Sequence, residues 1–263
     1  MLRFAANLGL LWPDRPLLAR LEAAAQAGFR AVEMHWPYEV AAETLGEVAR
    51  RNQLTLLGIN TSPGQFEAGE RGLGALIGRE LHFQASVDQA IAYCRIAGAR
   101  AIHAMAGNVP SAERLRARAV FRDNLRVAAA KAASHGLTLL LEPLNSCDNP
   151  GYFYSKLEEA VSLLEELNLP NLKLQFDVYH VARSEGDVLR KLRQLTSWLG
   201  NVQIAAVPSR AEPDEGEIAY PAIFQALEES GYTGWVGCEY RPRGDTGAGL
   251  AWLTHLGVTG GLR

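Results

Sequence analysis

Three things are scarce in this sequence: cysteine, net charge and long apolar runs. Its 263 residues include three cysteines, Cys94, Cys147 and Cys238, with no CxxC pair. That pattern is typical of a reducing compartment rather than of a disulfide scaffold. A formal net charge of −3 offers no general attraction to nucleic acid or to an anionic membrane. We therefore expect neither as a partner.

No apolar run approaches the roughly 20 residues that are needed to cross a bilayer. The N-terminal segment MLRFAANLGLLWPDRP begins with apolar residues, but Pro13 and Asp14 interrupt it and no small-residue cleavage site follows. Together with the cysteine pattern, this predicts a cytoplasmic protein without membrane association. A homo-oligomer is compatible with the composition.

Short apolar runs alternate with longer segments of helical periodicity along the whole chain. One predicted helix occupies 111–135, and another contains Leu157, Val161 and Leu164, which share one helical face. Glycines occur where predicted helices meet the next strands, in AGFR, AGAR, HGLT and SGYT, as suits left-handed helix ends. The eight predicted strands are 3–8, 30–35, 54–60, 99–105, 137–142, 172–177, 202–206 and 234–239.

Eight strands that alternate with helices over about 260 residues predict a (β/α)8 TIM barrel. An open doubly wound sheet is the main alternative, but no strand is followed by a GxGxxG turn and no composition break separates two domains. We expect a single domain over 1–263, with a flexible tail at about 257–263. The segments 61–79 and 207–219 are long for connections in a compact domain, so we interpret them as lids or binding loops.

The run LLLEPLN ends a predicted buried strand on a charged residue, Glu142. Asp177 and Glu239 end two later predicted strands in the same way, and Gln203 lies in the strand between them. The intervals from Glu142 to Asp177, Gln203 and Glu239 are 35, 26 and 36 residues in turn, each about one βα unit. The C-terminal ends of barrel strands converge where active sites lie, so we expect these four side chains to meet.

Three carboxylates and one amide oxygen form an all-oxygen set that suits Mg²⁺ or Mn²⁺ better than zinc. Without a cation, the three negative charges would repel one another and favour protonation of at least one carboxylate. The alternative is that each acid caps a strand or pairs with an arginine at the rim. Because the acids follow apolar runs on successive strands, we favour a metal site.

Two further residues are candidates for holding a substrate. His180 follows Asp177 by three residues in DVYH and would donate to a substrate oxygen; a loop histidine at a helix start is the alternative. Arg210, after the seventh predicted strand, has the planar fork that clamps a carboxylate, although surface arginines are common. For His35 and His103, near other strand ends, we favour core or supporting roles.

Over almost its whole length the chain resembles the hydroxypyruvate isomerase family of xylose isomerase-like TIM barrels. The stretches that carry the resemblance are MLRFAANL, GFRAVE, PGQFEAGERGLGALIGRE, LLLEPLN, QFDVYH, VQIA with RAEPDEGEIAYPAIF, and GWVGCEYRPRG. The resemblance implies that Glu142, Asp177, Gln203 and Glu239 bind a divalent metal. It also implies that Glu142 and Glu239 form the acid/base pair of an isomerase that acts on a short 2-oxo acid.

Two branches of that family are mixed in this sequence. EPLNSCDNPGYF and QFDVYH are similar to hydroxypyruvate isomerase, which converts hydroxypyruvate to tartronate semialdehyde through an enediolate. INTSPGQFEAGERGLGAL, PDEGEIAYP and YRPRGDTGAGLAW are similar to 2-oxo-tetronate isomerase. The chain departs from the family pattern at Ala206, where hydroxypyruvate isomerases tend to have Asp, and at Ala211, where the family often has His. Both departures bear on which acid is the substrate.

Other activities of similar barrels remain as alternatives. Ketose 3-epimerases use a similar glutamate pair, but generally have His where this chain has Gln203. Apurinic endonucleases need a histidine-rich trinuclear zinc site, whereas this chain has six histidines in all, with Asn60 and Gln203 at places where such a site would have His. A barrel that binds a metabolite without catalysis is a third alternative, against which the retained acids argue.

Overall fold

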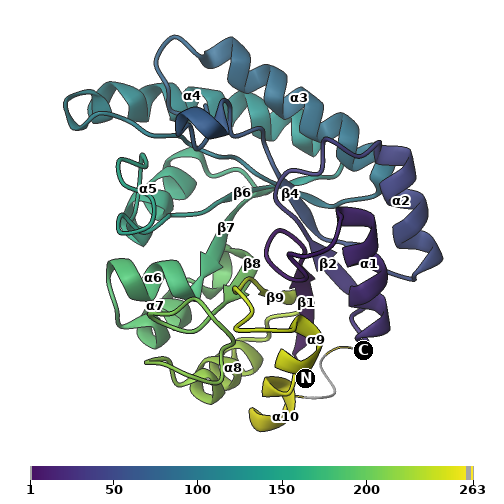
Figure 1. Ribbon diagram of the computed structural model, residues 1–263. Helices are drawn as coiled ribbons and strands as arrows, with labels where there is room; N and C mark the ends of the chain where they lie inside the picture. Colours follow the sequence, from purple (N-terminus) through teal and green to yellow (C-terminus); the bar gives the residue numbers. More distant parts are fainter. Residues whose placement is uncertain (1, 259–261, 263) are drawn as a thin grey trace.

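The computed structural model describes residues 2–258 and 262. Its strands form one parallel sheet with the order β3-β2-β1-β9-β8-β7-β6-β5-β4, which curves around a central axis (Figure 1). The strands are β1 Arg3–Asn7, β2 Ala31–Glu33, β3 Thr55–Leu56, β4 Gly58–Asn60, β5 Ala101–His103, β6 Thr138–Leu141, β7 Leu172–Asp177, β8 Leu199–Ile204 and β9 Trp235–Cys238.

The predicted strand 54–60 appears as two short strands, β3 and β4, on either side of Leu57. The Leu57 amide donates to the Val32 carbonyl at 2.8 Å, and the Leu57 carbonyl accepts from Arg100 at 3.1 Å. Beyond this residue β4 pairs with β5, while Gly58 and Asn60 still hydrogen-bond Met34 and His35 after β2, so the strand joins both neighbours and the barrel closes. The other seven predicted strands overlap β1, β2 and β5 to β9, which confirms the predicted (β/α)8 architecture.

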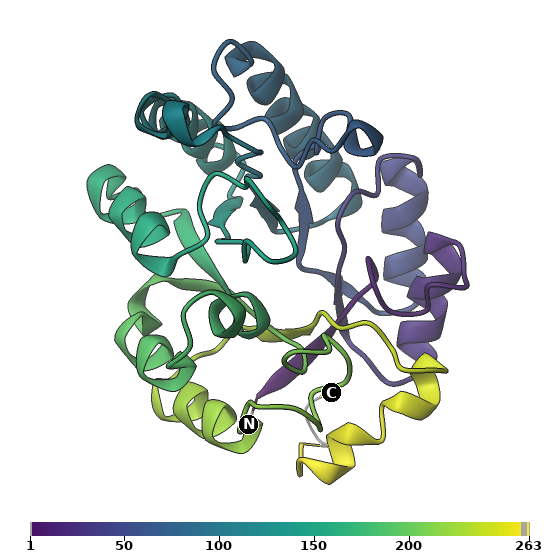
Figure 2. The same cartoon turned by 60° about the vertical axis from the view of Figure 1, so that its left-hand side comes forward.

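Helices form a ring outside the strands, as Figures 1 and 2 show. Their inward faces are apolar: α2 buries Leu45, Val48 and Ala49, and leaves Arg50 and Arg51 exposed. The helices are α1 Leu17–Gln26, α2 Ala42–Arg51, α3 Glu80–Ala97, α4 Arg114–Ala133, α5 Leu157–Leu167, α6 Val178–Ser184, α7 Val188–Gln194, α8 Tyr220–Glu229, α9 Thr246–Gly249 and α10 Trp252–His255, with 3-10 turns at Phe66–Ala68, Ser111–Glu113 and Thr196–Trp198.

Local sequence signals set several of these boundaries. Gly98 ends α3 with a φ of 94°, the left-handed conformation that was expected at this joint. The segment 61–79 contains only the short turn Phe66–Ala68 and an isolated β-bridge from Gly72 to Ala106, and 207–219 has no helix or strand, so both are loops as predicted. In the part of the chain that the structure describes, no helix is long and apolar enough to cross a membrane.

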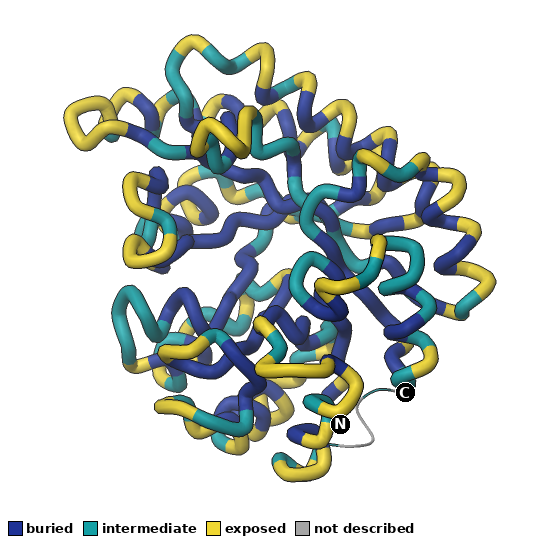
Figure 3. The backbone as a smooth tube through the Cα atoms, in the orientation of Figure 1, coloured by how far each residue is buried: buried dark blue, intermediate teal, exposed yellow. Residues whose placement is uncertain are grey.

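Most of the apolar core lies between the sheet and the helices, and exposure is concentrated on the outer faces (Figure 3). The inside of the barrel differs, because its strands bury polar side chains there: Asn7, Glu33, Gln175, Asn201 and Gln203. The expected flexible tail at 257–263 falls partly outside the described residues. Val258 and Leu262, which are described, pack against the core.

Candidate metal and active site

The structure brings the four predicted ligands to the C-terminal end of adjacent strands. Glu142 follows β6, Asp177 is the last residue of β7, Gln203 lies in β8 and Glu239 follows β9. Strands β7 and β8 pair in a register that sets Asp177 beside Gln203, and all four side chains are buried. The convergence expected from the spacing is therefore present.

Asp177 is held by the helix that follows it. One carboxylate oxygen, Oδ1, accepts from the Tyr179 amide at 2.8 Å and so caps α6. The other oxygen, Oδ2, is buried and has no hydrogen-bond donor among the described residues. Capping thus fixes one side of the carboxylate and leaves the other for a ligand.

In Gln203, as in Asp177, one polar side-chain atom is hydrogen-bonded and the other has no hydrogen-bond partner among the described residues. Its Nε2 donates to Glu33 Oε1 at 2.7 Å, whereas its buried Oε1 has no donor in the described part of the chain. Buried oxygens are normally satisfied, and a hard divalent cation prefers oxygen ligands. The two free oxygens, Asp177 Oδ2 and Gln203 Oε1, together with two nearby carboxylates therefore fit Mg²⁺ or Mn²⁺.

The charges of the ligand set conflict in the absence of a cation. Burial, followed by the charges of Glu239 and Asp177, raises the pKa of Glu142 well above its ordinary value. Burial and the Glu239 charge likewise raise the pKa of Asp177 to about 7. A divalent cation would favour the ionised form of both carboxyl groups.

Glu142 and Glu239 lie in different surroundings. Glu142 Oε2 accepts from Gln175 Nε2 at 2.7 Å, and His103 Nδ1 lies 3.3 Å from the same oxygen. Burial alone would raise the pKa of Glu239, but the hydrogen bond from His35 at 3.2 Å and the charge of Arg210 bring it to about 2.

His180 lies beside the ligand set, on α6. Its Nε2 is 3.5 Å from Asp177 Oδ2 and 3.9 Å from Glu142 Oε1, so these three side chains are close enough to share a cation. However, its Nδ1 accepts from the Asn145 amide at 3.0 Å. Burial, and then the charge of Arg210, lower the pKa of His180 to about 3. The ring is therefore neutral with its proton on Nε2, which makes it a donor rather than a ligand.

Arg210 reaches the same carboxylates from the loop after β8. Its Nη2 lies 3.1 Å from Glu239 Oε1 and 3.9 Å from Asp177 Oδ2, and its guanidinium stacks on Tyr179 at 4.9 Å. The backbone at Arg210 is left-handed, with a φ of 58°. The Ala206 carbonyl accepts from the Arg210 amide at 2.9 Å, which helps to hold the turn. The predicted clamp residue thus lies half-buried beside Glu239 and Asp177.

A cavity of about 400 Å³ opens over this cluster. Its lining includes Glu142, Glu239, His180 and Arg210 from the cluster, but neither Asp177 nor Gln203. Trp36, Phe66 and Arg71 are also among the lining residues, the last two from the predicted loop 61–79. Phe66 stacks between Trp36, at 5.2 Å between ring centroids, and the Arg71 guanidinium, at 4.1 Å. This loop therefore covers one side of the mouth.

The site also contains polar side chains outside the predicted set of ligands and substrate-binding residues, among them His103, for which a core or supporting role was expected. His103 is buried, lines the cavity and has no hydrogen-bond partner for either ring nitrogen among the described residues. Gln175 and Glu33 support Glu142 and Gln203 from inside the barrel. The sequence contained a sign that Glu33 could belong to the site, because RAVE also ends an apolar run on a charged residue. It contained no sign of the residues that Glu33 contacts.

Comparisons with known proteins agree with this geometry. A family model described as xylose isomerase-like TIM barrel matches residues 21–256. The chain is 47% identical to 2-oxo-tetronate isomerase of Cupriavidus necator, over 96% of this chain and 98% of that protein. It is 41% identical to hydroxypyruvate isomerase of Escherichia coli K12, with the same coverage of each.

Solved structures give the same picture of the fold. A Brucella melitensis protein, described as an AP endonuclease of family 2, has a TM-score of 0.94 and 44% identity, covering 97% of this chain and 99% of that one. A 3-keto-D-glucoside 4-epimerase from E. coli has a TM-score of 0.80 at 20% identity, covering 97% and 100%, which is a likeness of fold alone. The chain belongs to the xylose isomerase-like TIM barrel family.

Proposed function

We propose that this chain is an isomerase of short 2-oxo acids that converts hydroxypyruvate to tartronate semialdehyde, with 2-oxo-tetronate as the alternative substrate. Glu142, Asp177, Gln203 and Glu239 would hold one Mg²⁺ or Mn²⁺. The observation that carries the proposal is the pair of buried oxygens without donors, Asp177 Oδ2 and Gln203 Oε1, beside two glutamates. Both kinds of substrate appear in the names of relatives at 41–47% identity.

When bound, the cation would polarise the carbonyl and hydroxyl oxygens of the substrate. The protein's own contribution is proton transfer between neighbouring carbons. One glutamate removes a proton from the carbon beside the carbonyl, and the other returns a proton at the adjacent carbon. We assign these steps jointly to Glu142 and Glu239, which approach the cavity from β6 and β9.

Arg210 and His180 would hold the substrate. The guanidinium of Arg210 lies against Glu239 and Asp177, so a cation on those carboxylates would leave its fork for the carboxylate of the acid. The Nε2 proton of His180 would be donated to a substrate oxygen, and the Asn145 amide keeps that proton on Nε2. Both groups would stabilise negative charge as it develops.

Other features of the site weigh against the alternatives. An epimerase-type histidine is replaced by Gln203. A histidine-rich zinc site would have histidines at the places that Asn60 and Gln203 occupy in this chain. We also propose, from composition, a single-domain cytoplasmic protein without nucleic-acid or membrane partners; a homo-oligomer is compatible with it.

A coupled assay on purified protein tests the proposal. Hydroxypyruvate and a 2-oxo-tetronate are supplied to protein loaded with Mg²⁺ or Mn²⁺ and to protein stripped with EDTA. We expect turnover of at least one acid, its loss after stripping and its return with metal. Turnover undiminished by verified metal removal would contradict the mechanism. Activity confined to C4–C6 ketoses or to abasic-site DNA would replace it with the epimerase or the endonuclease function.

A further inference from the structure

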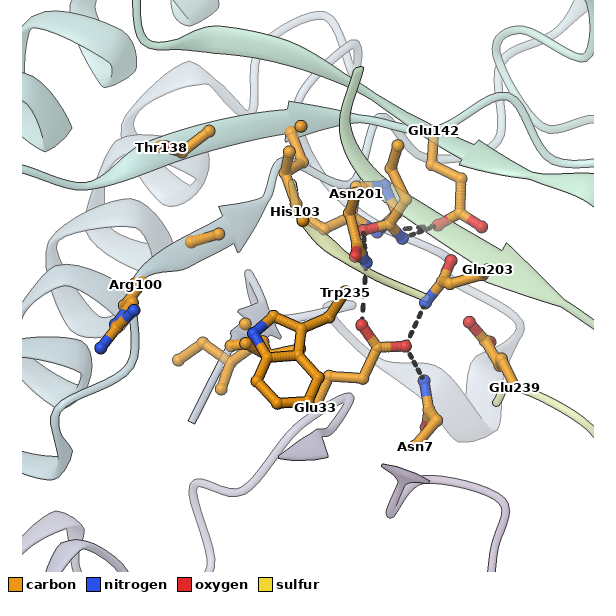
Figure 4. A pocket seen from close by; sticks show the side chains of 18 of the residues that line it. Asn7, Glu33, Arg100, His103, Thr138, Glu142, Asn201, Gln203, Trp235 and Glu239 are labelled. Atoms are coloured by element: carbon orange, nitrogen blue, oxygen red, sulfur yellow. Dashed lines mark hydrogen bonds and ion pairs between the residues drawn. The ribbon is translucent and has the colours of Figure 1, made fainter. Parts of the chain in front are cut away.

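Glu33 is a buried carboxylate that the proposed reaction does not use. It ends β2, inside the barrel, with 4% of its surface exposed. Oε1 accepts from Asn7 Nδ2 at 3.0 Å and from Gln203 Nε2 at 2.7 Å, and Oε2 accepts from Asn201 Nδ2 at 2.8 Å. Figure 4 shows this carboxylate between its three amide partners. It contacts no arginine or lysine among the described residues.

Each partner has its amide turned in one direction by this arrangement. Asn7 Oδ1 accepts from the Gly9 amide at 2.9 Å, so Nδ2 is the atom left for Glu33. Gln203 gives its Nε2 to Glu33, and its Oε1 is then directed away without a donor. A flipped Gln203 amide would set its carbonyl oxygen against the Glu33 carboxylate and its NH₂ group toward the metal ligands. An NH₂ group does not bind a cation.

The same carboxylate is connected to a second proposed ligand. Asn201 Nδ2, which donates to Glu33, also lies 3.3 Å from Gln175 Oε1. With its oxygen toward Asn201, Gln175 presents its Nε2 to Glu142 Oε2 at 2.7 Å. One buried carboxyl group that accepts from three amides therefore matches the orientation of every amide in the path from Glu33 to Glu142.

The barrel also leaves room for Glu33. A Cβ atom added at Gly237 would lie 2.3 Å from Glu33 Oε1 and 3.1 Å from Gln203 Cγ. Any larger residue at this position of β9 would thus push the carboxylate and the glutamine apart. The absence of a side chain at Gly237 therefore makes the contact between Glu33 and Gln203 possible.

We propose that Glu33 is a positioning residue that orients Gln203 so that Oε1, and not Nε2, faces the metal. The inference depends on the metal site proposed above and adds to it the reason why a glutamine can serve there. A glutamine ligand can present either end of its amide, so something must select the oxygen. A glutamate ligand would need no such selection, because both ends of a carboxylate are oxygens.

Binding of Mn²⁺ to EDTA-stripped protein, measured by isothermal titration calorimetry, tests this inference without any turnover. Four proteins form a double-mutant cycle: wild type, Glu33→Gln, Gln203→Glu and the double variant. With Gln203 present, Glu33→Gln replaces a carboxylate, which only accepts, by an amide that can also donate, so Gln203 is no longer held with its Oε1 toward the metal. We expect Mn²⁺ affinity to fall about 10- to 100-fold. In the Gln203→Glu background the same change should leave affinity equal or higher, since it removes repulsion between two carboxylates.

Asn7→Ser is the matched control, because it removes another donor to the same Glu33 oxygen and leaves the bond to Gln203. We expect its Mn²⁺ affinity to stay within about threefold of wild type. Equal losses from Glu33→Gln in both backgrounds, or an equal loss from Asn7→Ser, would overturn the inference. If wild-type protein bound no Mn²⁺, the metal proposal itself would fail instead.

Far-UV circular dichroism and thermal unfolding of the stripped proteins check that each variant folds. If Glu33→Gln alone does not fold, the comparison moves to Gln203→Glu against the double variant, in which the amide introduced by Glu33→Gln can donate to the carboxylate introduced by Gln203→Glu. Equal or tighter Mn²⁺ binding by the double variant supports the inference. Weaker binding by more than about threefold contradicts it.

Discussion

Asp177 accepts a hydrogen bond from the Tyr179 amide at 2.8 Å, so that one carboxylate both begins α6 and faces the candidate metal site with its second oxygen. We expect Asp177→Asn to separate the two roles, because asparagine keeps a capping oxygen but presents an NH₂ group to the site. Affinity for Mn²⁺ should fall more than about 100-fold, since ligand charge governs oxygen sites.

The metal-free protein should not lose stability in that variant. Removing a buried carboxylate whose pKa is raised by burial and by Glu239 removes repulsion, and we expect Tm to stay or to rise by about 2–4 °C. Asp245→Asn is the control: Asp245 caps α9 in the same way, through the Ala248 amide, and lies outside the ligand set. A metal affinity unchanged by Asp177→Asn would remove Asp177 from the site.

The affinity for metal should rise with pH. In the metal-free protein, burial and neighbouring charge raise the pKa of Asp177 to about 7 and that of Glu142 well above its usual value. A cation binds the ionised carboxylates and must displace these protons, so each proton displaced contributes up to about a tenfold gain per pH unit below the pKa. Calorimetry at pH 6.5 in two buffers of different ionisation enthalpy should show net proton release. A binding enthalpy independent of the buffer would contradict this.

The sequence alone could predict the barrel and the position of the proposed ligands, because both follow from backbone repetition. An apolar run that ends on an acid marks the C-terminal end of a buried strand, and Glu142, Asp177 and Glu239 all carry that signal. The short intervals then placed them on neighbouring strands. Nothing beyond alternation and spacing was needed for this part.

The supporting contacts could not be predicted in the same way, because they join side chains from distant segments. Asn145 and His180 meet only because the loop after β6 lies beside α6, which follows the adjacent strand β7. Their contact selects the proton position of the imidazole. The split at Leu57 likewise depends on which neighbour its backbone bonds. The sequence shows that Glu33 is a charged residue at the end of an apolar run. Its contacts with Asn201 and Gln203 could not be predicted, because they form across the closed barrel.

Glu239→Gln should remove most activity while the fold survives. The change keeps the size of the side chain but abolishes the carboxylate that contacts His35 and Arg210, and loss of a general acid or base typically lowers kcat by about 10²- to 10⁴-fold. Assays at saturating Mn²⁺ separate this effect from weaker metal binding. Glu217→Gln, which changes an exposed side chain of the loop 207–219, is the control. Near-normal turnover by Glu239→Gln at saturating metal would rule out its role.

His180→Gln distinguishes a donor from a metal ligand at this position. The Nδ1 atom of His180 is occupied by the Asn145 amide, and Nε2 lies 3.5 Å from Asp177 Oδ2, so we assign it as a donor to the substrate. Glutamine can still donate a hydrogen bond, but from a different place. We therefore expect Mn²⁺ affinity to change less than about threefold, while kcat/KM falls about 10- to 100-fold. A loss of metal affinity as large as that of Asp177→Asn would instead make His180 a ligand through Nε2, with its ring proton on Nδ1 and the hydrogen bond from the Asn145 amide broken.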